Sequence, residues 1–129
     1  MTQKGTAARK PLALVVEDHA DMAEMCFRSL EAAGYETEVI YSGGEALAWL
    51  SESTPHIITL DLHLPGLSGE TILHYVRSEA RLANTRVILF TGEQRRAEQV
   101  APNADLILLK PVTFDQLRDL ALRLHPAAK

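Results

Sequence analysis

Polar residues capable of chemistry follow short apolar runs in this chain of 129 residues. In order along the chain they are Glu17, Asp18, Asp61, Thr91 and Lys110. Three carboxylates brought together repel one another, so such a group needs positive charge nearby. Lysine supplies one positive charge, and Mg²⁺, which binds carboxylate oxygens and water, would supply the rest. A carboxylate can attack a phosphoryl group while a metal and an ammonium stabilise the charge, which predicts Mg²⁺-dependent phosphate chemistry.

The elements that would position these residues alternate between two patterns. Apolar runs predict strands at 12–16, 38–41, 56–60, 87–90 and 106–109. Spacings of three and four, together with capping patterns, predict helices at 20–33, 42–50, 68–81, 93–99 and 113–124. The two helix-capping patterns are Ser42 with Glu45 and Thr113 with Gln116. Such alternation predicts an α/β fold, a three-layer sandwich with a five-stranded parallel sheet and five helices. The carboxyl ends of parallel strands share one edge, so the polar residues should meet there.

Composition limits the functions to consider. The length indicates one domain, expected at 11–125 between a disordered arm at 1–10 and a tail at 126–129. A net charge of −4 argues against nucleic acid as a partner, and no apolar run is long enough to cross a membrane. Cys26 is the only cysteine, which is consistent with a cytoplasmic protein without disulfides. We expect it to pack the first helix onto the sheet with Met22 and Met25, and Trp49 to pack the second helix.

Four segments together resemble the receiver domain of two-component response regulators. They are LVVEDH, ITLDLHLPGLSG, LFTG and LLKPVT, in the family's order, and the resemblance runs from Pro11 to His125. It implies a flavodoxin-like sheet of order 2-1-3-4-5. It also implies that Asp61 accepts a phosphoryl group from a sensor histidine kinase or a phosphotransfer protein and then switches the surface for a downstream partner.

The resemblance also assigns roles to the remaining residues. Asp18 would bind Mg²⁺ directly, Glu17 would reach it through water, and the carbonyl oxygen of His63 would complete the protein's ligands along with Asp61. Thr91 and Lys110 would contact phosphoryl oxygens. The domain would then be a signalling module with self-catalysed chemistry and not an enzyme.

Three departures from the family pattern affect output and lifetime. Ile107 stands where many receivers have a switching aromatic residue, and the segment from Thr91 to Lys110 is short. Both put in doubt the effector and dimer contacts that relatives make there, and a weak homodimer stays an open alternative. His63 and Glu93 are unusual beside the acceptor, so we hypothesise that they tune the survival of the acyl phosphate. No output domain is expected within these residues, so output would pass to another molecule.

Other functions fit less well. A phosphatase of the haloacid-dehalogenase type needs Asp-x-Asp after its first strand, whereas Asp61 follows the third. A flavodoxin-like electron carrier needs a hydroxyl- and glycine-rich phosphate loop where this chain has Glu17 and Asp18. The histidines lack zinc-site spacing, and Arg95 and Arg96 are expected to be solvated. The main alternative is a degenerate receiver that acts as a constitutive protein-binding module.

Overall fold

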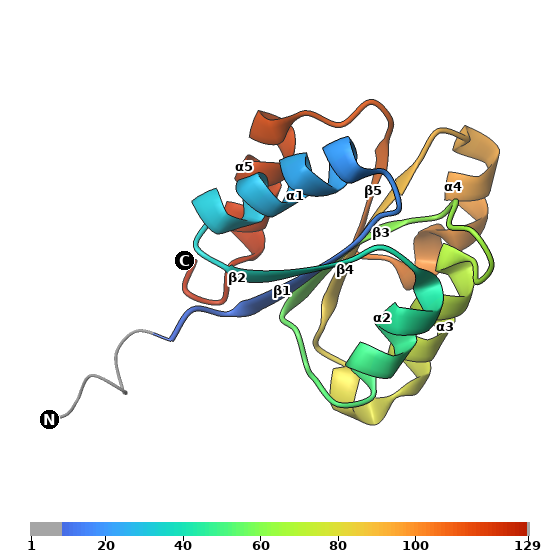
Figure 1. Ribbon diagram of the computed structural model, residues 1–129, viewed down its shortest axis with the longest axis horizontal. Helices are drawn as coiled ribbons and strands as arrows, with labels where there is room; N and C mark the ends of the chain where they lie inside the picture. The colour runs from blue at the N-terminus through green and yellow to red at the C-terminus, as the bar shows by residue number, and fades with distance from the viewer. Residues whose placement is uncertain (1–8, 129) are drawn as a thin grey trace, which may run out of the picture.

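The five predicted strands form one parallel sheet in the computed structural model, which describes residues 9–128. The strands are β1 (Leu12–Val16), β2 (Glu36–Ile40), β3 (Ile57–Asp61), β4 (Arg86–Thr91) and β5 (Leu106–Leu109). Their order is β2-β1-β3-β4-β5, and every neighbouring pair is parallel (Figure 1). The predicted fold class and strand order are therefore confirmed. Most of the predicted 1–10 arm and the last residue of the 126–129 tail lie outside the described residues.

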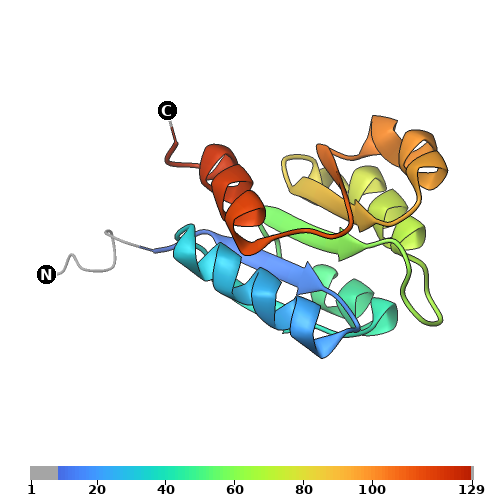
Figure 2. The same ribbon diagram turned by 90° about the horizontal axis from the view of Figure 1, so that it is seen from above.

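Helices cover both faces of this sheet and make it the middle of three layers (Figures 1 and 2). The helices are α1 (Ala20–Ala32), α2 (Gly43–Leu50), α3 (Gly69–Ser78), α4 (Gln94–Val100) and α5 (Phe114–Leu124). Short 3₁₀ turns, η2 (Ala80–Leu82) and η3 (Ala101–Asn103), follow α3 and α4. Helices α1 and α5 share one apolar cluster with the sheet, and α2, α3 and α4 share the other. No helix among the described residues is long and apolar enough to span a membrane.

The apolar residues of α1 and α2 pack as the sequence predicts. Cys26 is fully buried between α1 and the sheet, with Met22 and Met25 partly buried beside it. Burial raises the pKa of the Cys26 thiol to about 12. Trp49 packs against the opposite cluster but stays partly exposed. Of the two predicted capping patterns, Thr113 with Gln116 forms a complete capping box. The Ser42 hydroxyl accepts from the Glu45 backbone N–H and donates to the Glu45 carboxylate, both at 3.3 Å.

Two element boundaries differ from the sequence prediction by two residues or more, each for a physical reason. β2 begins at Glu36 and not at residue 38, because it is an edge strand whose first two residues, an exposed glutamate and a threonine, carry no apolar signal. α3 ends at Ser78 and does not reach Arg81. The Arg81 guanidinium instead donates to the carbonyl of Leu50, the last residue of α2, at 2.6 Å, and to that of Ser53, beyond the helix, at 2.9 Å.

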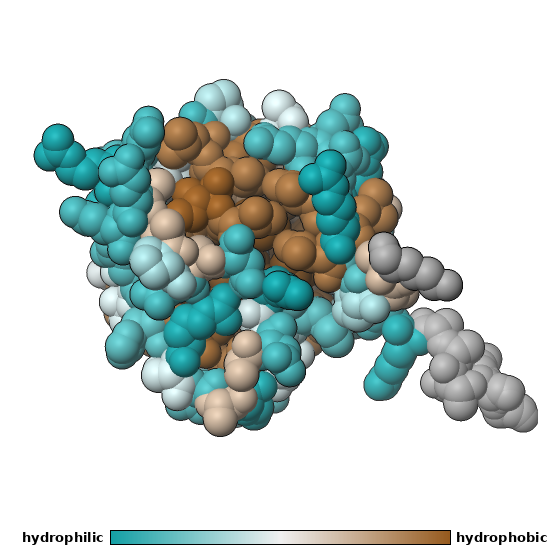
Figure 3. All heavy atoms as spheres, turned by 180° about the vertical axis from the view of Figure 1, so that it is seen from behind, coloured by the Kyte–Doolittle hydropathy of each residue, from teal (hydrophilic) through white to brown (hydrophobic). Residues whose placement is uncertain are grey.

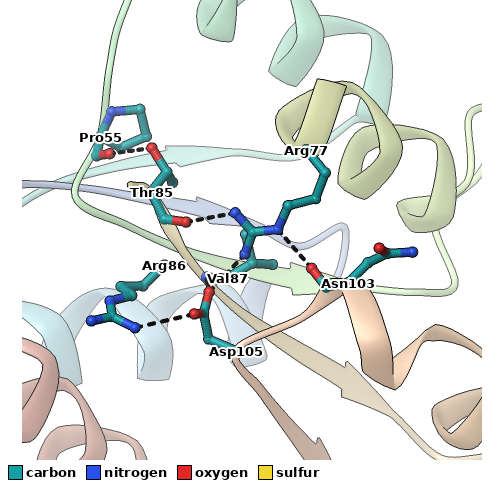
Figure 4. Close-up of polar contacts among 7 residues, drawn as sticks. All are labelled: Pro55, Arg77, Thr85, Arg86, Val87, Asn103 and Asp105. Carbon is teal, nitrogen blue, oxygen red and sulfur yellow. Dashed lines mark hydrogen bonds and ion pairs between the residues drawn. The ribbon is translucent and has the colours of Figure 1, made fainter. Parts of the chain in front are cut away.

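A partly buried polar network ties α3 to the amino-terminal ends of β4 and β5 (Figure 4). The Arg77 guanidinium donates to the carbonyls of Thr85, at 3.0 Å, and Asn103, at 2.7 Å, and to the Asp105 carboxylate, at 2.7 Å. The same carboxylate accepts from the backbone N–H of Val87 at 2.7 Å. One arginine thereby fixes the short connection between α4 and β5, and we call this set the Arg77 clamp.

Candidate functional site

The polar strand-end residues meet at one edge of the sheet, as the topology requires. β1 and β3 are neighbours, and β1 connects outward to β2 while β3 connects toward β4, so the strand order reverses between them. Asp61 is the last residue of β3, and Glu17 follows the last residue of β1. Thr91 ends β4, and Lys110 follows β5. The backbone N–H of Lys110 donates to the Thr91 carbonyl at 2.9 Å, which aligns the last two strands at the site.

Asp61 is buried and held from two sides. Its Oδ1 accepts a hydrogen bond from the backbone N–H of His63 at 2.9 Å. Its Oδ2 lies 3.2 Å from the Lys110 Nζ, an ion pair whose geometry leaves Oδ2 without a hydrogen bond. The carboxylate is therefore oriented by His63 and its charge is compensated by Lys110. Its Oδ2 still accepts no hydrogen bond.

The environment of Glu17 raises the pKa of its carboxyl group. Burial raises the pKa of its carboxyl group, and the Asp61 carboxylate raises it further. Two hydrogen bonds from His19 and the charge of Lys110 oppose this shift. The repulsion between carboxylates that the sequence predicts therefore contributes to the raised pKa of Glu17, whose side chain is almost completely buried.

The acidic cluster has the donor set for a hard divalent cation. One carboxylate oxygen from each of Glu17, Asp18 and Asp61 and one ring nitrogen of His19 all lie within 4.8 Å of one another. Glu17 Oε1, Asp18 Oδ1 and Asp61 Oδ2 are each buried without a hydrogen-bond partner in the described chain. Buried carboxylate oxygens without hydrogen bonds are costly, and the single charge of Lys110 does not balance three carboxylates, so these three residues fit Mg²⁺.

His19 belongs to this cluster, although the sequence analysis did not select it. Its Nδ1 lies 3.2 Å from Glu17 Oε2 and 3.4 Å from Asp18 Oδ1, while most of its ring faces solvent. Its position directly after the acidic pair was the only signal in the sequence. The backbone N–H of His63 contacts Asp61, and the role predicted for the His63 carbonyl oxygen as a metal ligand stays a prediction.

The side chains of His63 and Glu93 meet at the mouth of the site. His63 Nε2 lies 3.5 Å from Glu93 Oε2, and both side chains are about half exposed. The backbone N–H of Glu93 donates to the buried Thr91 hydroxyl at 3.1 Å. Arg96, expected to be solvated, pairs with Glu70 at 3.0 Å and so joins α4 to the start of α3.

Gly69 brings the start of α3 against the acceptor strand. A Cβ at this position would lie 2.8 Å from the Leu62 Cα and closer still to the Asp61 carbonyl oxygen. Only glycine permits this approach of helix to strand. The loop from His63 to Ser68 therefore starts and ends in close contact with the β3 terminus.

The fold and the site together define a class of protein. It is an open, doubly wound α/β domain with an acidic site at the point where the strand order reverses. The sequence model of the response regulator receiver domain family matches residues 13–122, and the chain belongs to that family. The family is one of signalling domains. Among curated relatives, the chain is 32% identical over 110 residues to the phosphate regulon transcriptional regulatory protein PhoB of Rhizobium meliloti. It is 30% identical over 113 residues to the sensor histidine kinase TmoS of Ectopseudomonas mendocina.

Solved structures agree with this membership. The chemotaxis response regulator CheY4 of Vibrio cholerae aligns with a TM-score of 0.81 and 27% identity, covering 90% of this chain and 99% of that one. The receiver domain of a histidine kinase from Syntrophus aciditrophicus aligns with a TM-score of 0.79 and 30% identity, covering 88% and 89%. By contrast, the matched region covers 48% of the PhoB relative and 11% of TmoS, so the chain spans about half or less of these relatives.

Proposed function

We propose that this domain accepts a phosphoryl group on Asp61 in a Mg²⁺-dependent reaction and thereby changes its surface for a downstream partner. The observation that carries the proposal is the set of three buried carboxylate oxygens, on Glu17, Asp18 and Asp61, that accept no hydrogen bond within the described residues, with Lys110 3.2 Å from the acceptor. The donor is a phosphohistidine on a sensor kinase or phosphotransfer protein. The lone buried thiol of Cys26 suits a reducing compartment, so the exchange is assigned to the cytoplasm.

Each residue has a distinct part in the transfer. The Asp61 carboxylate forms the new oxygen–phosphorus bond as the phosphorus–nitrogen bond to the donor histidine breaks and its electron pair returns to the ring. Lys110 offers its ammonium to the transferring phosphoryl oxygens, and Thr91 offers its hydroxyl. Asp18 and Glu17 would hold Mg²⁺ with Asp61 and the carbonyl of His63. When bound, the ion neutralises negative charge on the carboxylates and the phosphoryl group.

The face formed by α4, β5 and α5 is the surface we propose for the downstream partner. β5 is an edge strand, and its side chains Leu106 and Ile107 are only partly buried, while Leu109 is 46% exposed. Figure 3 shows apolar side chains gathered on the rear face of the molecule, where this strand runs. A surface of this kind also suits the weak homodimer that the sequence analysis left open.

The proposal is tested by incubating the protein with acetyl phosphate and Mg²⁺ and recording its intact mass. The expected result is a gain of one phosphoryl group that disappears in Asp61→Asn and in the presence of a chelator. The matched control is Asp21→Asn, because Asp21 lies on the first turn of α1 outside the acidic cluster. No mass gain, with no binding of Mg²⁺, would overturn the proposal in favour of a constitutive binding module.

A further inference from the structure

A groove between β2 and α2 lies away from the residues assigned to phosphoryl transfer. It has a volume of about 480 Å³ and is lined by Val39, Ile40, Tyr41, Glu45, Ala48, Trp49 and Glu52. Its aromatic side chains are accessible to solvent, since Tyr41 is 52% exposed and Trp49 is partly exposed. An accessible aromatic pair in a groove is typical of a protein-binding surface.

The backbone beside the groove is an open sheet edge. β2 pairs only with β1, through the Glu36 N–H and the Ile40 carbonyl among others. In a parallel strand the backbone N–H and carbonyl groups of alternate residues point toward opposite neighbours. The backbone groups of Thr37 and Val39 therefore point away from β1, toward the open edge. The Thr37 N–H is satisfied by the Glu31 carboxylate at 3.0 Å. Within residues 9–128, no strand or side chain takes up the Val39 N–H and carbonyl, so this residue can pair with an added strand.

The charge around the groove selects the chemistry of the added strand. Residues 36–52 contain four glutamates and no lysine, arginine or histidine, and the whole chain has a net charge of −4. The remainder of the chain is therefore neutral overall. These glutamates are Glu36, Glu38, Glu45 and Glu52, all exposed. None of them forms an ion pair within the described part of the chain.

We propose that the groove between β2 and α2 is a docking site for an extended, cationic segment of a partner protein. The segment adds a strand to the free edge of β2 by pairing with Val39, places an apolar side chain against Tyr41 and Trp49, and places lysine or arginine beside the glutamates. In a strand, positions two apart share a face, so the recognised pattern is a basic, an apolar and a basic residue at alternate positions. This site does not depend on phosphorylation of Asp61.

The surrounding chemistry excludes other classes of occupant. Nucleic-acid phosphates and anionic lipid headgroups would be repelled by the unpaired glutamates. A second copy of this segment would bring four more glutamates against them, so a symmetric contact through the groove is disfavoured.

A synthetic peptide provides the test. In this peptide, threonine alternates with three residues that face the groove: lysine, isoleucine and lysine. The affinity of the peptide for the protein is measured by fluorescence anisotropy. Ala48→Arg places a bulky cation on the exposed groove-facing side of α2 and should weaken binding about tenfold or more. Ala83→Arg is the matched control on an exposed alanine elsewhere and should leave binding unchanged. If Ala48→Arg does not fold, Tyr41→Thr removes an exposed anchor and should also weaken binding.

Two further arms separate strand addition from general charge attraction. A peptide with N-methylated backbone amides, which cannot donate ladder hydrogen bonds, should lose binding, and hydrogen exchange at the Val39 amide should slow only with the unmodified peptide. The proposal is overturned by absence of binding, by equal binding of Ala48→Arg and wild type, or by equal binding of the methylated peptide.

Discussion

Glu17 and Asp18 are adjacent in the sequence, yet the fold gives them different environments. The Glu17 side chain is 2% exposed, whereas the Asp18 side chain is 27% exposed and can meet an ion arriving from solvent. Glu17 is also held by His19, while Asp18 Oδ1 has no hydrogen bond. Asp18 is therefore the residue whose loss should most directly affect Mg²⁺ binding.

Mg²⁺ should stabilise the folded protein, and Asp18→Asn should remove this effect. An ion that binds only the folded state at ten times its Kd adds about 1.4 kcal/mol, or roughly 5 °C in Tm for a domain of this size. Thermal unfolding followed by circular dichroism with and without Mg²⁺ measures the shift. Asp21→Asn should retain it, and an unchanged shift in Asp18→Asn would contradict the proposed ligand set.

The raised pKa of Glu17 gives the metal-free protein a specific pH dependence. The folded protein holds a proton on Glu17 that the unfolded chain releases near the ordinary pKa of 4.5. As pH rises from there through the raised pKa, the free energy of unfolding therefore falls. Glu17→Gln should lack this fall and be more stable than wild type near neutral pH in chelator, as measured by urea unfolding. Equal stability of the two proteins across this range would count against it.

The contact between His63 and Glu93 should slow the loss of the phosphoryl group. Their side chains meet 3.5 Å apart, each within two residues of a buried site residue, Asp61 or Thr91, and our hypothesis is that they obstruct hydrolytic water. His63→Asn and Glu93→Ala should each lose the acyl phosphate several-fold faster, measured by intact mass against time. Glu98→Ala, on the exposed side of α4, is the control, and unchanged lifetimes in the first two variants would remove the hypothesis.

Site residues were predictable from the sequence where each stood at the end of an apolar strand. Asp61 and Thr91 terminate strands that neighbouring elements cover on both faces, so the change from apolar to polar is abrupt. His19 and the contact between His63 and Glu93 could not be found this way. They depend on how loops are placed in space, for which neither composition nor periodicity carries a signal.

At the scale of elements, α4 is the shortest of the five helices α1 to α5. It spans only Gln94–Val100, in agreement with the short segment between Thr91 and Lys110. The Arg77 clamp fixes its exit into β5, and the pair between Arg96 and Glu70 fixes it to α3. The clamp joins residues far apart in sequence, so only the structure reveals why a short helix can be held in place.

Removal of the Arg77 clamp should cost much more stability than removal of a surface ion pair of the same length. The N–O distance is 2.7 Å both for Arg77 with Asp105 and for Arg28 with Glu24. Exposure is 25% and 22% in the first pair but 69% and 59% in the second. Arg77→Met should cost about 2 kcal/mol because it leaves the Thr85 and Asn103 carbonyls without this donor and removes the nearer of the two arginines that pair with Asp105, whereas Arg28→Met should cost about 0.5 kcal/mol or less.

Urea unfolding of these two variants at equal pH and salt measures the difference. Arg77→Lys should recover only part of the loss, because lysine keeps the charge but lacks the planar fork that reaches three acceptors. Equal small losses in Arg77→Met and Arg28→Met would show that the clamp does not hold the α4 to β5 connection.

At the scale of the whole molecule, the strand order brings the acidic residues of the site together. The alternation of strands and helices was readable from the sequence, and the order β2-β1-β3-β4-β5 followed only from the family resemblance. That order places β1 beside β3 and so unites carboxylates from residues 17, 18 and 61. The edge strand β2 was harder to delimit because Glu36 and Thr37 lack the apolar signal of the covered strands.

The most direct test of the central claim identifies the residue that carries the phosphoryl group. Sodium borohydride reduces an aspartyl phosphate to homoserine, which peptide mass mapping can locate. After incubation with acetyl phosphate and Mg²⁺, we expect homoserine at Asp61 alone, and none when Mg²⁺ is chelated. Homoserine at another carboxylate, or an unmodified Asp61 in protein that binds Mg²⁺, would contradict the assignment.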